Sequence, residues 1–272
     1  MKPISNMAFY CCGVRMLDAA DENPLCCDAY AKFFMDEYGR RIYDKFRDES
    51  VSNASIIVRH RIIDDMLRQM LRSRPDLCVV SIGAGFDSRP YRLTGGTWFE
   101  LDEPELLAYK NARLPVCECP NPLRRIPINF CSDALQDKLA EITHQGPVVF
   151  VLEGVIIYLD QEETRQLLAT LNDLFPQHQL ICDLVSRAMV EHYGQTLQAI
   201  IEEVGTCLKA VDAPESIFLM NGYQVRQAIS ILAVAAELGI NIVPEFILRL
   251  FFQEEMKGNS VYLLETRNRE TD

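Results

Sequence analysis

The chain has 272 residues, of which 49% are hydrophobic, so it is long enough to bury one large α/β core or a core that carries a cap. Its 39 acidic residues outnumber its 27 basic residues, and the net charge of −12 disfavours binding to the phosphate backbone of nucleic acids. Because the sequence has neither an apolar run of membrane-spanning length nor a leader pattern in residues 1–10, we expect a cytoplasmic protein with no membrane partner.

The first part of the chain predicts helices. Residues 1–52 are expected to form a segment of shorter helices. Residues 53–72 predict one long helix, because Ile56, Ile63 and Leu67 recur at helical spacing and would form one buried stripe.

From residue 77 onward, short apolar runs alternate with amphipathic stretches, which is typical of a parallel sheet with crossover helices. Strands are predicted over residues 77–82, 98–101, 125–128, 147–152 and 180–184. A helix is predicted over residues 160–175, and another begins near Pro104. The pattern therefore predicts an α/β protein with a doubly wound, mostly parallel, seven-stranded sheet.

After residue 184 the pattern becomes mostly helical as far as residue 239, which is too long for a single crossover. We therefore predict an inserted helical cap over residues 186–239, with the core formed by residues 53–185 and 240–272. Two closing strands are expected around residues 246–252 and 260–266.

The clearest local signal is a buried strand that runs into the turn Gly83-Ala84-Gly85. Glycines permit unusual backbone angles and let a ligand approach the main chain closely. A dinucleotide-binding turn would have a third glycine where this chain has Ser88, which weighs against a nicotinamide cofactor. A tight turn that binds no ligand is the alternative.

Acidic residues follow two further strands of the predicted sheet. Glu100 and Asp102 end the second strand, where a carboxylate is placed to accept both hydroxyls of a ribose, although Asp102 could instead cap the next helix. Glu153 ends the fourth strand. Because ligands of such sheets bind outside the carboxyl ends of the strands, Gly83, Asp102 and Glu153 are expected to face one crevice.

Histidines and cysteines give weaker indications. Of the four histidines, only His192, beside Tyr193 in the predicted cap, is placed to overhang the crevice, so His192 and Tyr193 are the candidates for a general base, with an ordinary cap residue as the alternative. The ten cysteines have no spacing typical of structural zinc, so we expect ordinary reduced cysteines and no metal site. No motif supports catalysis by a serine, histidine and aspartate triad.

Three segments together carry a specific resemblance, namely GAGFDSRPYRL (83–93), FELDEPELLAYK (99–110) and EGVIIYLDQEET (153–164). They resemble the central motifs of the leucine carboxyl methyltransferase family, which includes bacterial O-methyltransferases assigned to polyketide biosynthesis. Residues 15–31 also resemble the bacterial branch, so the likeness covers most of residues 10–185. The resemblance implies a class I, Rossmann-like methyltransferase that uses S-adenosyl-L-methionine (adenosylmethionine).

The resemblance also implies roles for individual residues. Arg59 would pair with the carboxylate of the cofactor, unless Arg61 is the true match or Arg59 is an ordinary solvated residue. The other implied cofactor-binding residues are Gly83, Ala84 and Gly85 at the turn, Asp102 at the ribose, Glu153 beside the methionine portion, and Phe130. Where the family often has an aspartate that meets the adenine amino group, this chain has Asn129, whose amide oxygen can still accept a hydrogen bond.

The reaction expected from this resemblance is O-methylation of a small, polyketide-like hydroxyl or carboxylate. The alternatives are methylation of a protein or peptide carboxyl group, a non-catalytic adenosylmethionine-binding protein, and an oxidoreductase that uses nicotinamide. Methyl transfer from a sulfonium is an in-line displacement, so the protein mainly has to align the reactants in a dehydrated cleft. Neither the methyl acceptor nor the oligomeric state is indicated by the sequence.

Overall fold

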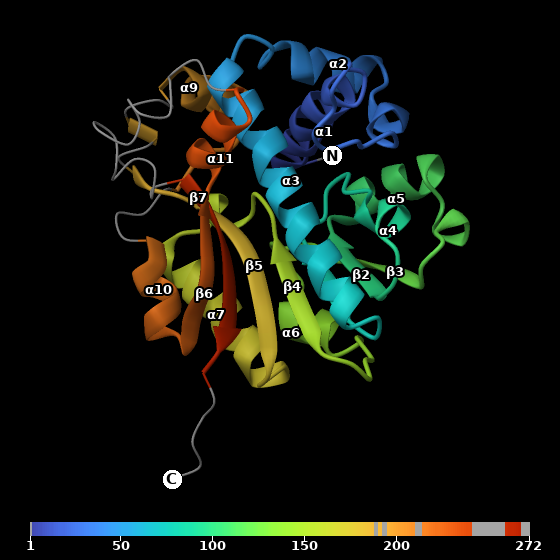
Figure 1. The fold of residues 1–272 in the computed structure, drawn as a ribbon, viewed down its shortest axis with the longest axis vertical. Coiled ribbons are helices and arrows are strands. Elements are labelled where there is room, and N and C mark those ends of the chain that lie inside the picture. Colours follow the sequence, from blue (N-terminus) through green and yellow to red (C-terminus); the bar gives the residue numbers. More distant parts are fainter. Residues whose placement is uncertain (1, 188–189, 192–194, 210–213, 241–258, 268–272) are drawn as a thin grey trace.

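The computed structural model describes residues 2–187, 190–191, 195–209, 214–240 and 259–267. Its strands form one seven-stranded sheet in the order β3-β2-β1-β4-β5-β7-β6 (Figure 1). The strands are β1 Cys78–Ile82, β2 Thr97–Asp102, β3 Leu123–Pro127, β4 Val148–Leu152, β5 His178–Val185, β6 Tyr223–Ser230 and β7 Asn259–Thr266. Neighbours from β3 to β5 are parallel, whereas β7 is antiparallel to both β5 and β6. The predicted doubly wound, mostly parallel sheet is confirmed.

Helices cover both faces of the sheet and its upper end (Figure 1). The α-helices are α1 Asn6–Asp18, α2 Glu37–Asp44, α3 Ser50–Ser73, α4 Arg89–Arg92, α5 Pro104–Arg113, α6 Leu135–Leu139, α7 Gln161–Leu174, α9 Gln195–Glu203, α10 Pro214–Met220 and α11 Ile231–Glu237. The 3-10 helices are η1 Pro3–Ser5, η2 Ala31–Phe34, η3 Val116–Glu118 and η4 Ile156–Tyr158. Helix α7 begins with a capping box, because Asp160 and Glu163 each accept the other's backbone N–H.

Strand β1 shows why the central strands read as continuous apolar runs. Val80 and Ile82 pack into the core cluster that includes residues of α7, whereas Val79 packs on the other face with residues of α3. Both faces of β1 are therefore buried, and no polar alternation is needed. A third apolar cluster joins α1, α2 and α9 above the end of the sheet toward which the parallel strands point (Figure 1).

The sheet differs from the prediction at its β6 edge. Residues 223–230 were expected to belong to a helical cap, but they form β6, which pairs with β7. Arg226, Gln227 and Ala228 are exposed on this edge strand, so it lacks the apolar run that marks a buried strand. The expected helical cap over residues 186–239 is therefore wrong for this part. The predicted strand around 246–252 lies outside the described residues.

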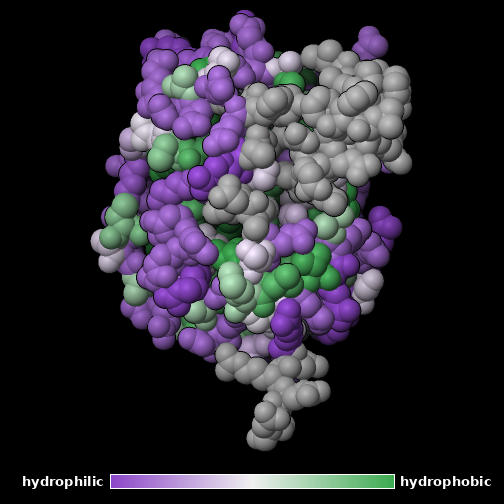
Figure 2. Space-filling model, turned by 90° about the vertical axis from the view of Figure 1, so that its left-hand side faces the viewer, coloured by the Kyte–Doolittle hydropathy of each residue, from purple (hydrophilic) through white to green (hydrophobic). Residues whose placement is uncertain are grey.

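The surface is mostly hydrophilic on the face that Figure 2 presents, with hydrophobic residues between the hydrophilic ones. Leu219 and Met220 at the end of α10 are exposed.

All ten cysteines are free. Within the described ranges, no helix combines the length and the apolar character that crossing a membrane requires.

Candidate active site

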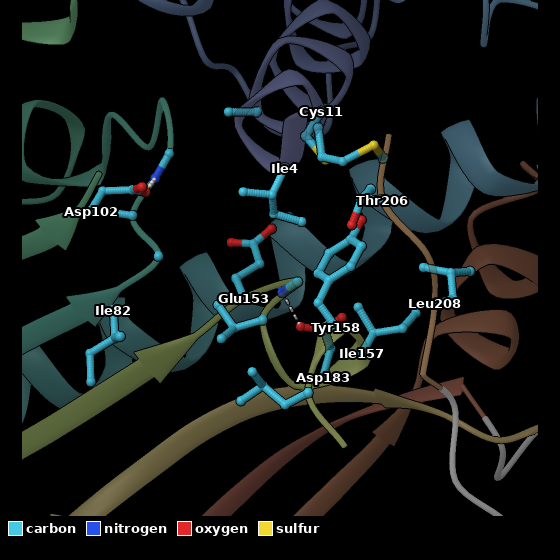
Figure 3. Close-up of a pocket in the computed structure, with 18 of the residues that line it drawn as sticks. Ile4, Cys11, Ile82, Asp102, Glu153, Ile157, Tyr158, Asp183, Thr206 and Leu208 are labelled. Carbon is cyan, nitrogen blue, oxygen red and sulfur yellow. Dashed lines mark hydrogen bonds between the residues drawn. The ribbon is translucent and has the colours of Figure 1, made fainter. Parts of the chain in front are cut away.

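A cavity of about 940 Å³ lies at the carboxyl ends of the parallel strands, which is large among small-molecule sites, for which about 300–1,000 Å³ is common. Its floor includes the turn after β1, the ends of β2, β4 and β5, and part of α3. Residues of η1, α1, η4 and the segment 206–209 are among those that line the remaining walls (Figure 3). Of the residues predicted from the sequence, the cavity brings together Arg59, Gly83, Ala84, Gly85, Asp102, Phe130 and Glu153.

The glycine turn presents its backbone to the cavity. Gly83 and Gly85 have φ values of +69° and +48°, which side chains of L-residues rarely permit. A Cβ atom on Gly83 would lie 2.7 Å from the Cγ2 atom of Val155. The Gly83 N–H donates to the carbonyl of Leu101 over 2.9 Å, so the turn is fixed to the end of β2. Because Gly83, Ala84 and Gly85 all line the cavity, a ligand can lie directly against this main chain.

Asp102 ends β2 and connects it to the glycine turn. Its Oδ2 atom accepts the Gly85 N–H over 2.6 Å, and its Oδ1 atom accepts the N–H of Glu103 over 2.7 Å. Burial raises the pKa of Asp102 to about 6, although these two N–H groups act in the opposite direction. The residue at the N-cap of α5 is Glu103, so Asp102 does not cap that helix. Its carboxylate instead lies at the cavity wall.

Glu153 lies among cations at the end of β4. Its Oε2 atom accepts an N–H of Arg89 over 2.7 Å, and its Oε1 atom lies 3.3 Å from both the Nε atom of Arg59 and the Nδ1 atom of His60. Burial would raise the pKa of this carboxyl, but Arg89, His60 and Arg59 outweigh burial and hold the pKa well below its usual range. The Glu153 side chain, which is 14% exposed, is thus an ionised carboxylate held mainly by these cations.

Arg89 extends this arrangement beneath the cavity floor. Its side chain is 1% exposed, and it also pairs with Asp64 over 2.6 Å and with Asp87 over 2.9 Å. A buried arginine requires such partners, because an unpaired buried charge is costly. The motif residue Arg89 therefore holds together α3, the turn after β1 and the end of β4.

Of the two candidate arginines of α3, Arg59 reaches the cavity, which Arg15 of α1 also lines. The Nη1 atom of Arg59 donates to Asp183 over 2.9 Å, and burial, which would lower the pKa of Arg59, is outweighed by Asp183 and Glu153. Arg61, the alternative match, pairs with Asp65 over 2.7 Å on the exposed side of α3 and does not line the cavity. The structure therefore favours Arg59 as the arginine of the site.

The residues after β3 divide between the cavity and its rim. Phe130 lines the cavity and is 44% exposed. Asn129 does not line it, because its amide oxygen accepts hydrogen bonds from the Lys2 ammonium over 2.6 Å and from the Cys131 N–H over 3.1 Å. The expected contact of Asn129 with a ligand is therefore not supported. His192 and Tyr193 lie outside the described residues.

Several lining residues were not predicted. Asp183, at the end of β5, contacts Arg59 and the backbone of Gly154. It follows an apolar run as Glu153 does, so the convergence of strand ends could have indicated it. The opposite wall is mainly apolar and aromatic, and Figure 3 shows Ile4, Ile157, Tyr158 and Leu208 around it. Within the described ranges, no group of three or more His, Cys, Asp or Glu side chains could hold a metal ion.

The model of the family described as leucine carboxyl methyltransferase matches residues 8–172, which is more than half of the chain. The chain belongs to the leucine carboxyl methyltransferase family. This confirms the resemblance drawn from the three sequence motifs. These segments contribute the glycine turn, Asp102 and Glu153 to one cavity.

Curated relatives in actinobacteria carry the name "Putative S-adenosyl-L-methionine-dependent methyltransferase". A protein of Parafrankia is 34% identical over 45% of this chain, one of Frankia alni is 31% identical over 57%, and one of Streptomyces avermitilis is 30% identical over 66%. The matches span 41%, 59% and 69% of these relatives, respectively. Their names agree with the cofactor expected from the sequence.

Solved structures share the fold at low sequence identity. A DUF574 family protein from Streptomyces avermitilis has a TM-score of 0.59 at 9% identity, and the likeness covers 88% of this chain and 95% of that one. The magnesium protoporphyrin IX methyltransferase from Synechocystis, crystallised with SAH, has a TM-score of 0.50 at 16% identity and coverage of 83% and 94%. These likenesses establish a methyltransferase-type fold for the chain.

Proposed function

We propose that this chain is an adenosylmethionine-dependent O-methyltransferase that acts on a small, polyketide-like hydroxyl or carboxylate. One observation carries the proposal: a single cavity joins a glycine turn, the carboxylates of Asp102 and Glu153 and the Arg59 guanidinium to a mainly apolar wall. The turn, the carboxylates and the arginine suit a nucleoside with an amino-acid tail. The apolar wall suits an organic methyl acceptor. Membership of the leucine carboxyl methyltransferase family supports the same reaction.

The residues present fit the cofactor. The turn Gly83-Ala84-Gly85 lines the cavity and would take the adenosyl part against its main chain. Asp102 would accept the ribose hydroxyls, and Phe130 would pack near the adenine. Arg59 would hold the carboxylate of the amino-acid tail, while the Glu153 carboxylate would attract its ammonium group.

When bound, adenosylmethionine supplies a methyl group on a sulfonium centre. The chain's own residues then orient the acceptor and keep water from it, and Ile4, Ile157 and Leu208 are suited to exclude water. A carboxylate acceptor is already ionised at neutral pH, whereas a hydroxyl gains from a base. His192 and Tyr193 remain our candidates for that base.

Three other functions make different demands on the site. Methylation of a protein or peptide carboxyl group would use the same cofactor residues with a larger acceptor. A non-catalytic protein would bind the cofactor and transfer nothing. A nicotinamide cofactor is disfavoured, because Ser88 stands where a dinucleotide-binding turn would have its third glycine. The Ser88 side chain is buried, and its hydroxyl is hydrogen-bonded to Asp28 and Arg92.

Calorimetry with adenosylmethionine, S-adenosylhomocysteine and NAD tests the cofactor, and we expect binding of the first two ligands alone. Transfer of a tritiated methyl group to a panel of phenols, alcohols, small carboxylic acids and peptides tests the reaction. Labelled product from the small molecules is expected. Binding of NAD in place of adenosylmethionine would contradict the proposal, and labelled peptide alone would replace it with the carboxyl methylation of peptides.

A further inference from the structure

Asp183 connects three separate elements at the wall of the cavity. Its side chain is 2% exposed. Its Oδ1 atom accepts the N–H of Gly154 over 2.6 Å (Figure 3). Its Oδ2 atom accepts an N–H from Nη1 of Arg59 over 2.9 Å. One carboxylate at the end of β5 thus fixes both the turn after β4 and an arginine from α3.

The backbone of Gly154 lies directly beside the same guanidinium. Gly154 has a φ of +65°, and a Cβ atom built on it would lie 3.4 Å from Nη2 and 3.5 Å from Nη1 of Arg59. The arginine head therefore packs against a position that has no side chain. Asp183 binds both the N–H of this glycine and the guanidinium of Arg59. It therefore holds the turn and the guanidinium next to each other.

Asp183 constrains Arg59 more strongly than Glu153 does. The contact from Arg59 to Asp183 is 2.9 Å, whereas the contact to Glu153 is 3.3 Å. The Glu153 carboxylate is also shared with Arg89 over 2.7 Å. Without the charge of Asp183, the guanidinium of Arg59 would have to be oriented by Glu153, whose contact is longer and whose carboxylate also binds Arg89.

We propose that Asp183 is a positioning residue that acts through Arg59 on the amino-acid end of the cofactor. An arginine side chain has many rotamers, and holding it in place before binding removes that ordering cost from the binding step. The guanidinium has five N–H groups, so the two carboxylates leave others for a ligand. This inference rests on the proposed function, because it assumes that adenosylmethionine occupies the cavity.

Two ligands separate this role from a general structural one. S-adenosylhomocysteine has an amino-acid tail, whereas 5′-methylthioadenosine has the same nucleoside and a thioether sulfur without that tail. Asp183→Asn keeps the shape and an oxygen for the Gly154 N–H but removes the negative charge. We expect about tenfold weaker binding of S-adenosylhomocysteine by calorimetry, the effect of one charge-assisted hydrogen bond, and a change of less than about twofold for 5′-methylthioadenosine.

Asp65, which lies in the same helix as Arg59, provides a matched control. Asp65 also pairs with an arginine of α3, Arg61, but on its exposed side and away from the cavity. Asp65→Asn should leave the affinity for both ligands unchanged. A loss with this variant equal to that of Asp183→Asn would mean that removing any carboxylate from α3 or its partners weakens binding, and it would overturn the assignment.

A double variant tests whether Asp183 acts through Arg59. If it does, Arg59→Lys/Asp183→Asn binds S-adenosylhomocysteine about as weakly as Arg59→Lys alone. Fully additive losses would show that Asp183 contacts the ligand itself, and they would overturn the positioning role. So would equal losses for the two ligands, or no loss with Asp183→Asn.

Gly154→Ala provides a second route if Asp183→Asn does not fold. Alanine is strained at the φ of +65° of Gly154, so the turn that contacts the guanidinium would shift. We therefore again expect a selective loss of S-adenosylhomocysteine binding, and an equal loss of both ligands would overturn the role. Wild-type protein that binds neither S-adenosylhomocysteine nor 5′-methylthioadenosine would instead contradict the proposed function. The wild-type titrations therefore distinguish the two failures.

Discussion

At one end of the cavity the Glu153 carboxylate contacts Arg89 and Arg59, whereas at the other end the Asp102 carboxylate accepts two backbone N–H groups. The difference appears in the pKa values. Burial opposes ionisation at both sites, but the arginines hold the pKa of Glu153 well below its usual range, while the pKa of Asp102 is raised to about 6. Backbone N–H dipoles orient the Asp102 carboxylate but do not offset the effect of burial on its pKa. The full positive charges of the arginines do offset it at Glu153.

The two carboxyl groups therefore affect stability in opposite directions as the pH falls. Glu153 has a depressed pKa in the folded protein, so its contribution is present above its ordinary pKa of 4.5 and is lost as the pH falls through the lower folded value. Asp102 has a raised pKa, so its ionised form costs stability above about pH 6. That cost is relieved as the pH falls from about 6 toward its ordinary pKa of 3.8.

Removing Arg89 is expected to have the largest effect, because it pairs with Asp64, Asp87 and Glu153. Arg89→Met would leave buried carboxylates without this cation, and breaking a buried pair in this way costs about 3–5 kcal/mol. Urea unfolding at pH 7 measures the loss. Arg68→Met, on the more exposed side of the same acidic residue, Asp64, is the control and should cost less than about 1 kcal/mol. Similar losses for both variants would contradict the importance of burial.

At the ribose end, the main expected effect is on binding. Asp102→Ala should weaken adenosylmethionine binding by about 1.5–3 kcal/mol, or roughly tenfold to over a hundredfold, because it removes charge-assisted hydrogen bonds to the ribose. Isothermal titration calorimetry measures the affinity, and circular dichroism confirms that the variant is folded. Unchanged affinity in a folded variant would remove Asp102 from the cofactor site.

Arg59→Lys tests the methionine end without removing its charge. Lysine cannot reproduce the planar fork of a guanidinium, so we expect adenosylmethionine binding to weaken by about 1–3 kcal/mol, with most of the stability retained. Arg61→Lys, on the exposed side of α3, should have much less effect. If Arg61→Lys loses binding and Arg59→Lys does not, the carboxylate ligand is Arg61.

The smallest effect expected is a dependence of affinity on pH. An ionised Asp102 accepts ribose hydroxyl hydrogens better than a protonated one, so affinity should fall as the pH drops through about 6. A group with that pKa is about nine-tenths protonated at pH 5, which gives roughly a tenfold loss relative to pH 8. Calorimetry over this range should show the loss in wild type and a flatter profile for Asp102→Asn. A flat wild-type profile would contradict the raised pKa.

The central sheet could be predicted because its strands are buried on both faces. β1 and β4 are apolar throughout apart from Ser81, so their runs stand out from the amphipathic helices around them. β6 could not be found in this way, because it lies at the edge of the sheet and carries exposed polar residues such as Arg226. Its identity as a strand comes from pairing with β7, which no local pattern records.

The positions of site residues could be predicted where the residue lies at the end of a strand that the sequence reveals. Gly83, Asp102 and Glu153 each end a recognisable strand, so the topology places them together. The hydrogen bond between Lys2 and Asn129 was not predictable, because the two residues lie 127 positions apart and Lys2 belongs to no motif. Likewise, Arg89 stands in a recognised motif, but its pairing with Glu153 spans 64 positions and depends on the packed structure.

The position of β7 in the sheet has a consequence for protein synthesis. β7 comes last among the described strands, yet it lies between β5 and β6. On a ribosome that adds about 5–20 residues per second, β5 and β6 emerge before the strand that pairs with both. The nascent chain therefore exposes open strand edges for several seconds before β7 can pair with them.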